Sequence, residues 1–161
     1  MSVTRANVFD FIARQIYGVV ASRSADGAPQ AALVGFVTNT KLELFFDTFG
    51  ETRKAENLRR DPRVAFVIGG GVPGDERTVQ LEGIADTPVG AELEAYRESY
   101  FRTLPDARRR AALPGITYFR VRPHWIRYSD YNANPPAIVV FEGDSLEPSA
   151  PTSAYRPTSA Y

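Results

Sequence analysis

The chain carries several short segments in which apolar and polar residues alternate, the pattern of half-buried strands. Residues 16–22 and 29–38 alternate in this way on either side of an Ala-Asp-Gly turn sequence at positions 25–27. This arrangement predicts a β-hairpin. Residues 41–47 also alternate. We expect them to form a partly exposed strand that joins the hairpin in a three-stranded meander.

The second half of the chain adds further strand patterns. Apolar runs or alternating segments occupy residues 63–68, 77–85, 116–121, 125–128 and 137–141. Pro123 lies between the third and fourth of these segments, and proline cannot donate a ladder hydrogen bond. We therefore expect either one long, bent edge strand or two short strands over residues 116–128.

Segments with the helical spacing of apolar residues occur at only a few places along the chain. Residues 2–15, 52–61 and 91–101 predict amphipathic helices, and a shorter helical turn is expected at 106–113. Six or more short strands then follow one another in hairpin order with few helices between them. The pattern therefore predicts a mainly β protein, a closed or partly open antiparallel barrel of Greek-key-like order.

Composition divides the chain into one domain and a tail. Residues 1–142 carry the predicted elements, whereas residues 143–161 are rich in Ser, Pro, Thr and Ala and contain P-T-S-A-Y at 151–155 and again at 157–161. Because the tail lacks the apolar residues of a core, we expect it to be disordered. Docking of its two regularly spaced tyrosines on a partner subunit is the alternative.

The net charge and the residue composition argue against several classes of function. The 161-residue chain has zero formal net charge, so no bulk positive field attracts nucleic acid or an anionic membrane. It contains no cysteine and one histidine, His124, which excludes thiolate metal sites and leaves no second histidine for a metal. No apolar run is long enough to cross a bilayer, and the first 15 residues are unlike a signal peptide. We expect a cytoplasmic protein without metal, nucleic-acid or membrane partners.

The helix predicted at residues 52–61 carries cations at its unfavourable end. Arg53 and Lys54 fall in the first turn, where the helix dipole already places partial positive charge. A bound anion would remove this repulsion, and the free N–H groups of the first turn and the Thr52 hydroxyl would help to bind it. The sequence thus predicts a phosphate site at Thr52, Arg53 and Lys54. A merely solvated helix face is the alternative.

Five motifs follow one another along the chain. They are V-V-A-S-R-S-A-D-G-A-P-Q-A-A-L-V-G-F from residue 19, L-F-F-D-T from 44, T-R-K-A-E-N-L-R-R-D-P-R-V-A-F-V from 52, R-T-V-Q-L-E-G-I-A from 77 and Y-F-R-V-R-P from 118. In this order they resemble the pyridoxamine-phosphate-oxidase-like family, flavin-binding proteins built on a split β-barrel. The resemblance covers most of residues 11–142, and the third and fourth motifs are its most specific parts.

The resemblance implies that flavin mononucleotide (FMN) lies at the interface of a homodimer. It places the phosphate on Arg53 and Lys54 with the help of Thr52. The main chain beside the flavin ring would be that of Ala32, Leu33, Val34, Gly35 and Phe36, and the ribityl side would be lined by Phe46, Asp47 and Thr48. Thr78 stands where the family often has Gln. Either Thr78 or Gln80, two residues on along the same strand face, would reach the ring or the ribityl chain.

The C-terminal end departs from true pyridoxamine-phosphate oxidases. Those proteins resemble one another in an F-W pair and an R-L-H segment that grip the vitamin substrate, whereas residues 122–132 here are R-P-H-W-I-R-Y-S-D-Y-N. Oxidation of pyridoxamine phosphate is therefore not expected. The resemblance implies an FMN-dependent oxidoreductase acting on an unidentified small substrate. The flavin would carry the chemistry, so no catalytic residue is assigned.

Other functions stay open on the sequence alone. A deazaflavin-dependent reductase of the same fold would need a wider basic groove, to which Arg59, Arg60 and Arg63 could belong. A flavin-binding module without turnover would have the same sequence pattern. The family also resembles some heme-degrading proteins, for which His124 would be the one available histidine ligand. A nucleic-acid-binding barrel would bind with a steep salt dependence and carry no flavin.

Overall fold

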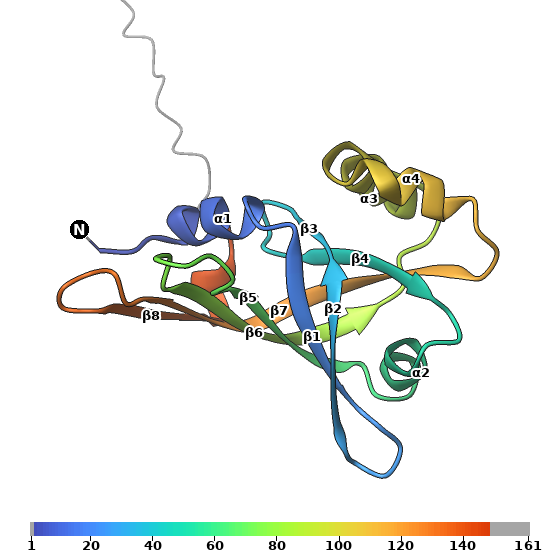
Figure 1. The fold of residues 1–161 in the computed structure, drawn as a ribbon, viewed down its shortest axis with the longest axis horizontal. Coiled ribbons are helices and arrows are strands. Elements are labelled where there is room, and N and C mark those ends of the chain that lie inside the picture. Colours follow the sequence, from blue (N-terminus) through green and yellow to red (C-terminus); the bar gives the residue numbers. More distant parts are fainter. Residues whose placement is uncertain (1, 149–161) are drawn as a thin grey trace, which may run out of the picture.

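The computed structural model describes residues 2–148, which fold around one strongly curled eight-stranded sheet (Figure 1). Its strands are β1 (Tyr17–Arg23), β2 (Pro29–Gly35), β3 (Val37–Thr38), β4 (Leu44–Phe49), β5 (Arg63–Gly69), β6 (Arg77–Asp86), β7 (Ile116–Asp130) and β8 (Ala137–Glu142). The order is β2-β1-β5-β6-β7-β4-β3, every pairing is antiparallel, and β8 also pairs with β7. β2 and β4 approach each other, but no ladder joins them within residues 2–148. The predicted antiparallel barrel is thus confirmed in its split form.

β7 is a single long strand in the middle of the sheet. It pairs with β6 on one side, and on the other its first part pairs with β4 and its last part with β8. Glu82 pairs with Trp125 whereas Gly83 pairs with Pro123, so His124 is the extra residue of a bulge. Pro123 is tolerated because it lies at this fork, beyond the ends of both the β4 and the β8 ladder. The predicted edge position and the alternative of two short strands are wrong.

β4 is covered on both faces. Phe46 is fully buried in the barrel, while Phe45 is buried on the opposite face under the helical segment after β6. The ladder partners of β4 are β3 and β7, not the first hairpin. The predicted partly exposed strand and three-stranded meander are therefore wrong. The strand also starts later than expected, because Leu42 has a φ of 61° in the preceding turn.

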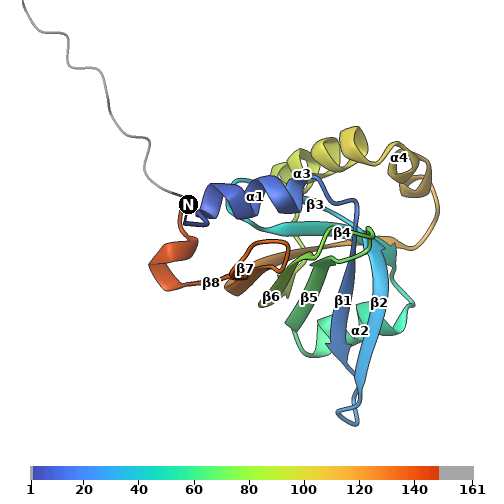
Figure 2. The ribbon, with the colours of Figure 1, turned by 60° about the vertical axis from the view of Figure 1, so that its left-hand side comes forward.

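The helices cover the ends and one face of the sheet (Figure 2). They are α1 (Arg5–Ala13), α2 (Arg53–Arg60), α3 (Gly90–Thr103), α4 (Pro105–Ala111) and the short 3₁₀ helix η1 (Gly143–Leu146). α2 contacts β1, β2 and β6, whereas α3 packs on β3 and β4. No helix in the described part of the chain is long and apolar enough to span a membrane. The two P-T-S-A-Y repeats lie outside the described residues.

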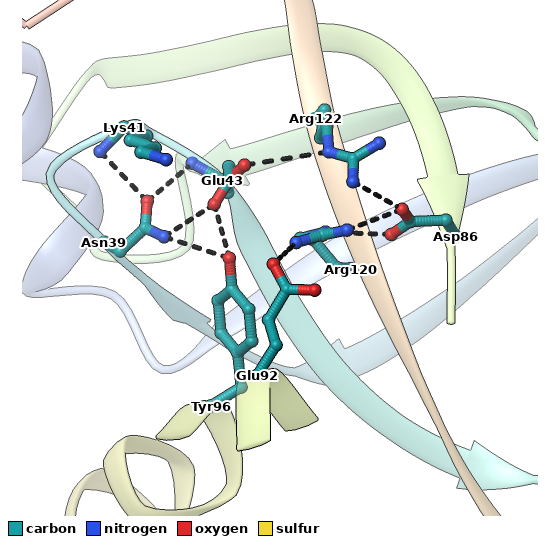
Figure 3. Close-up of polar contacts among 8 residues, drawn as sticks. All are labelled: Asn39, Lys41, Glu43, Asp86, Glu92, Tyr96, Arg120 and Arg122. Carbon is teal, nitrogen blue, oxygen red and sulfur yellow. Dashed lines mark hydrogen bonds and ion pairs between the residues drawn. The ribbon is translucent and has the colours of Figure 1, made fainter. Parts of the chain in front are cut away.

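A polar network fastens α3 to the sheet (Figure 3). The Tyr96 hydroxyl donates to Glu43, and the Arg120 guanidinium bonds both Asp86 and Glu92. Glu43 and Arg120 are buried, so these contacts are shielded from water. Tyr96 also stacks on Phe45, with ring centroids 5.1 Å apart. α3, and α4 directly after it, are thereby held over the outer face of β4.

Gly83 lies opposite the bulge of β7, where a side chain has no room. A Cβ atom there would come within 2.5 Å of the Arg122 carbonyl oxygen and 2.9 Å of Val121 Cγ1. We expect Gly83→Ala to lower the free energy of unfolding by about 1–3 kcal/mol, as overpacking does. Urea denaturation measures this loss. Gly71→Ala is the control, because a Cβ there meets nothing within 4 Å; equal losses in the two variants would contradict the assignment.

Candidate functional site

Helix α2 is fixed against the β1–β2 hairpin by its buried face. Ala55 and Leu58 are buried, as their spacing predicts. Asn57 Nδ2 donates to Ser22 Oγ at 3.0 Å and to Gln30 Oε1 at 2.9 Å. Because these anchors lie on one side of a two-turn helix, the first turn of α2 is held at a defined place next to both hairpin strands.

Thr52 occupies the N-cap position of α2, as predicted, but its side chain does not cap the helix. Its hydroxyl donates to the Phe49 carbonyl oxygen at 2.8 Å and lies 3.1 Å from Thr48 Oγ1. The backbone N–H groups of the first turn therefore have no side-chain acceptor from the cap residue. These donors stay available to a bound anion.

The cations at the two ends of α2 differ in their partners. Arg59 and Arg60, in the last turn, donate to the carbonyl oxygens of Gly50 and Arg23. Arg53 and Lys54, in the first turn, make no side-chain hydrogen bond or ion pair with any residue in the range 2–148. Burial lowers the pKa of Lys54, which is the effect expected of a partly desolvated cation without a counterion.

Two pockets meet at Lys54. The first, here called the α2 pocket, has a volume of about 410 Å³ and is lined by Val20, Ser22, Gln30, Ala31, Ala32, Glu51, Thr52, Arg53 and Lys54. The second, the α4 pocket, has a volume of about 280 Å³ and is lined by Tyr17, Leu33, Val34, Gly35, Asp47, Thr48, Lys54, Leu104, Pro105, Asp106 and Arg110. The α2 pocket contains the candidate anion site. The α4 pocket combines apolar walls with charged groups.

Most of the predicted site residues line these two pockets. Ala32, Thr52 and Arg53 line the α2 pocket, Lys54 lines both, and the α4 pocket is lined by Leu33, Val34, Gly35, Asp47 and Thr48. The side chains of Phe36 and Phe46 are fully buried in the barrel core, so only their main chains are available to a ligand.

Thr78 and Gln80 line neither pocket. They lie on β6, and both β1 and β5 separate that strand from β2. Gln80 pairs with Val67, and Val67 with Val19, on the solvent-facing side of the sheet. Within one chain, the structure does not bring these two predicted residues together with the others.

The sequence interpretation missed the helical wall of the α4 pocket. Leu104, Pro105, Asp106 and Arg110 come from α4 and the residue before it, a segment predicted only as a helical turn. The available signal was the run of three arginines at 108–110 beside a Pro-Asp helix start, because helical periodicity turns one of them towards the sheet. Nothing in the sequence around these arginines indicates that the segment contacts β4.

A buried carboxylate connects α4 to the sheet. Asp47, whose side chain is 8% exposed, accepts hydrogen bonds from Arg110 Nε at 3.2 Å and Arg110 Nη2 at 3.3 Å. The Tyr100 hydroxyl lies 3.0 Å from Asp47 Oδ1 and 3.1 Å from the Gly35 carbonyl oxygen. This network joins α3, α4, β2 and β4 at the wall of the α4 pocket.

Burial raises the pKa of Tyr100 above its ordinary value of 10.0, and the negative charge of Asp47 acts in the same direction. When the pKa of a group is higher in the folded than in the unfolded chain, the group's contribution to stability is fully present below the unfolded pKa. This contribution is lost as the pH rises from the unfolded pKa through the folded one. We expect the free energy of unfolding to fall above about pH 10. Denaturant titrations at several pH values measure this slope. Tyr100→Phe should reduce it, and an unchanged slope would contradict the assignment.

His124 is exposed in the bulge of β7 and lines a separate open groove. The same groove contains Arg23 and Arg63, and both guanidinium groups pair with Asp61, at 2.9 and 2.7 Å. Within residues 2–148, no three His, Asp or Glu side chains gather closely enough to hold a metal ion.

Comparisons with known proteins show which family and which solved structures this chain resembles. The sequence profile of the family described as pyridoxamine 5'-phosphate oxidase matches residues 4–130. A heme binding protein from Mycobacterium smegmatis is similar in structure, with a TM-score of 0.77 and 20% identity, and the match covers 91% of this chain but only 61% of that protein. No curated protein sequence matches the chain.

Two further solved structures share the fold. A pyridoxamine 5'-phosphate oxidase-related, FMN binding protein from Nostoc punctiforme has a TM-score of 0.64 at 15% identity, with 82% of this chain and 83% of that chain covered. A heme storage protein from Vibrio cholerae has a TM-score of 0.64 at 16% identity, with 76% and 91% covered. At these identities the likeness shows a common fold, on which both flavin and heme binders occur.

Proposed function

The chain belongs to the pyridoxamine 5'-phosphate oxidase family, and from this we propose that it is an FMN-binding oxidoreductase acting on a small substrate. The observation that carries the proposal is the pair of cations at the start of α2, Arg53 and Lys54, whose side chains make no hydrogen bond or ion pair within residues 2–148. Lys54 connects this anion site to the α4 pocket, whose walls are partly apolar. A phosphate joined to a flat, mostly apolar ring system matches that combination.

The two pockets fit the two ends of FMN. The phosphate would lie in the α2 pocket against Arg53, Lys54 and the N–H groups of the first turn. The ring would lie in the α4 pocket along β2. β2 stands at the end of the strand order, so one side of its backbone has no ladder partner among the described strands. Its unpaired N–H and C=O groups can bind the polar atoms of a ring without polar side chains.

Bound FMN would supply the redox chemistry. The protein's own residues would hold the phosphate, orient the ring and restrict access to it. No acid–base group is required of the chain for this role, and we assign no catalytic side chain. The substrate stays unidentified, and the oxidation of pyridoxamine phosphate is not proposed.

We further propose that the protein is a homodimer with the cofactor at the subunit interface. Tyr17, Val19, Leu33 and Val67 are exposed on adjacent strands and form an apolar patch on the outer face of the sheet. Tyr17 and Leu33 also line the α4 pocket, so a second copy on this patch would border the pocket. Gln80 lies three strand spacings from β2, about 14 Å. It would therefore reach a ring on β2 from the partner copy.

Two alternatives of the same fold are less well supported. The cations that a deazaflavin groove would need are already engaged, since Arg59 and Arg60 bind carbonyl oxygens and Arg63 binds Asp61. The cations in the groove of His124, Arg23 and Arg63, likewise share the Asp61 carboxylate. The side chains of Arg53 and Lys54, by contrast, make no hydrogen bond or ion pair within residues 2–148.

Anaerobic reduction tests the oxidoreductase assignment. The FMN-loaded protein is mixed with NADH or NADPH without oxygen, and the visible flavin absorption is followed before and after an electron acceptor is admitted. The proposal predicts loss of the flavin band, its recovery with the acceptor, and repetition over many cycles. Tight FMN binding without reduction by either nucleotide would favour a non-catalytic flavin-binding module.

A further inference from the structure

Arg110 is the only arginine of its run that lines the α4 pocket. Arg109, one residue earlier, has an 84% exposed side chain and pairs with Asp106 on its own helix. The guanidinium of Arg108 lies over the Phe101 ring, 5.1 Å from its centroid. Helix α4 thus turns Arg108 and Arg109 away from the pocket and directs Arg110 towards β4.

Asp47 fixes the orientation of Arg110. Arg110 Nε bonds Asp47 Oδ2, and Arg110 Nη2 bonds both Asp47 Oδ1 and the Tyr100 hydroxyl, the last at 3.4 Å. The Nη1 donors have no hydrogen-bond acceptor within residues 2–148. A guanidinium can only donate hydrogen bonds, and 37% of this side chain is exposed. Arg110 therefore presents a half-satisfied, pre-oriented donor group at the wall of the pocket.

The two ends of the flavin ring system differ in their ability to accept hydrogen bonds from a guanidinium. One end of the ring system carries methyl groups and accepts no hydrogen bond, while the other carries carbonyl oxygens and ring nitrogens that do. A guanidinium gains nothing from the first end and makes charge-assisted hydrogen bonds with the second. The polar edge of the ring is thus the part that complements Arg110.

We propose that Arg110 binds the polar edge of the flavin ring in the α4 pocket, and that Asp47 and Tyr100 are positioning residues for Arg110. This inference rests on the proposed function. It changes the role predicted for Asp47, whose oxygens are occupied by Arg110 and Tyr100 rather than directed to the ribityl chain. A cation at that edge also stabilises negative charge on the ring, so Arg110 raises the midpoint potential of the bound flavin.

The test compares Arg110→Gln with Arg102→Gln, which removes the same charge at an exposed position of α3 outside both pockets. Dissociation constants are measured for FMN and for riboflavin, which has the ring but no phosphate, and the midpoint potential of bound FMN is measured for each protein. We expect Arg110→Gln to weaken both ligands about ten-fold or more and by the same factor. The midpoint potential should fall, and Arg102→Gln should change neither the dissociation constants nor the midpoint potential.

Asp47→Asn tests the positioning role. We expect it to weaken both flavins in the wild-type background but to add little to the loss in Arg110→Gln, because the two residues act as one unit. Additive losses would mean that Asp47 contacts the ligand itself and would overturn the positioning role. If Arg110→Gln unfolds, as judged by its Tm, Arg110→Lys replaces it. This variant keeps the charge but loses the planar donor pair, so partial loss is expected.

The outcomes separate this inference from the proposed function. Unchanged affinity for both flavins in a folded Arg110→Gln protein would overturn the inference and leave FMN binding intact. A loss for FMN but not for riboflavin would make Arg110 a phosphate contact and would also overturn it. Absence of any flavin binding by the wild-type protein would instead overturn the proposed function.

Discussion

Replacing both Arg53 and Lys54 with Ala is expected to weaken FMN binding by about 3–6 kcal/mol, since each charge-assisted contact contributes about 1.5–3 kcal/mol. The fold should persist, because neither side chain contacts another described residue through a hydrogen bond or ion pair, and alanine favours a helix. Quenching of flavin fluorescence measures the affinity. The affinity for riboflavin, which lacks the phosphate, should fall much less in this variant.

The control for this double variant is Lys41→Ala with Arg102→Ala. Both positions are exposed and lie outside the α2 and α4 pockets, and the pair removes the same net charge. FMN affinity should stay near the wild-type value in the control. Equal losses in the two double variants would assign the effect to overall charge, and an unchanged affinity in the Arg53/Lys54 variant would contradict the phosphate site.

The second large effect is expected from Val67→Asp on the apolar patch. Val67 is 47% exposed on β5, so a carboxylate there stays hydrated in a monomer but would be buried without a partner in the proposed dimer. We expect dissociation to monomers, measured by light scattering, together with about ten-fold or greater loss of FMN affinity, because each site would lose the residues of the partner copy.

Ile84→Asp is the matched control for the interface. Ile84 is 40% exposed on β6 of the same sheet but lies outside the apolar patch, so a new carboxylate there is expected to stay hydrated. This variant should keep the wild-type mass and FMN affinity. A wild-type protein that is monomeric, or a Val67→Asp protein that stays dimeric, would contradict the interface at this patch.

The candidate anion site could be proposed from the sequence because its signal is local. Thr52, Arg53 and Lys54 are neighbours at the start of one helix, and the repulsion between the two cations and the helix dipole does not depend on the rest of the fold. Their connection to β2 required the family resemblance, because an apolar strand has the same pattern with or without a ligand. The structure adds that β2 is an edge strand and that Lys54 lies between the two pockets.

The missed features depend on contacts between distant parts of the chain. Arg110 and Asp47 are 63 positions apart, and nothing near either residue indicates that they meet. The central position of β7 was missed because proline normally marks a strand edge, whereas here a bulge and a forked ladder accommodate Pro123. Residues 41–47 looked half exposed because Glu43 and Asp47 are polar, whereas these side chains are buried in contacts with Tyr96 and with Tyr100 and Arg110.

The most direct test is the visible absorption of the wild-type protein after incubation with FMN, with riboflavin or with hemin, followed by desalting. We expect a retained flavin spectrum with one FMN per chain, weaker retention of riboflavin and no specific hemin spectrum. Failure to retain FMN, equal retention of riboflavin, or a heme spectrum that disappears in His124→Ala would contradict a phosphate-anchored flavin at the start of α2.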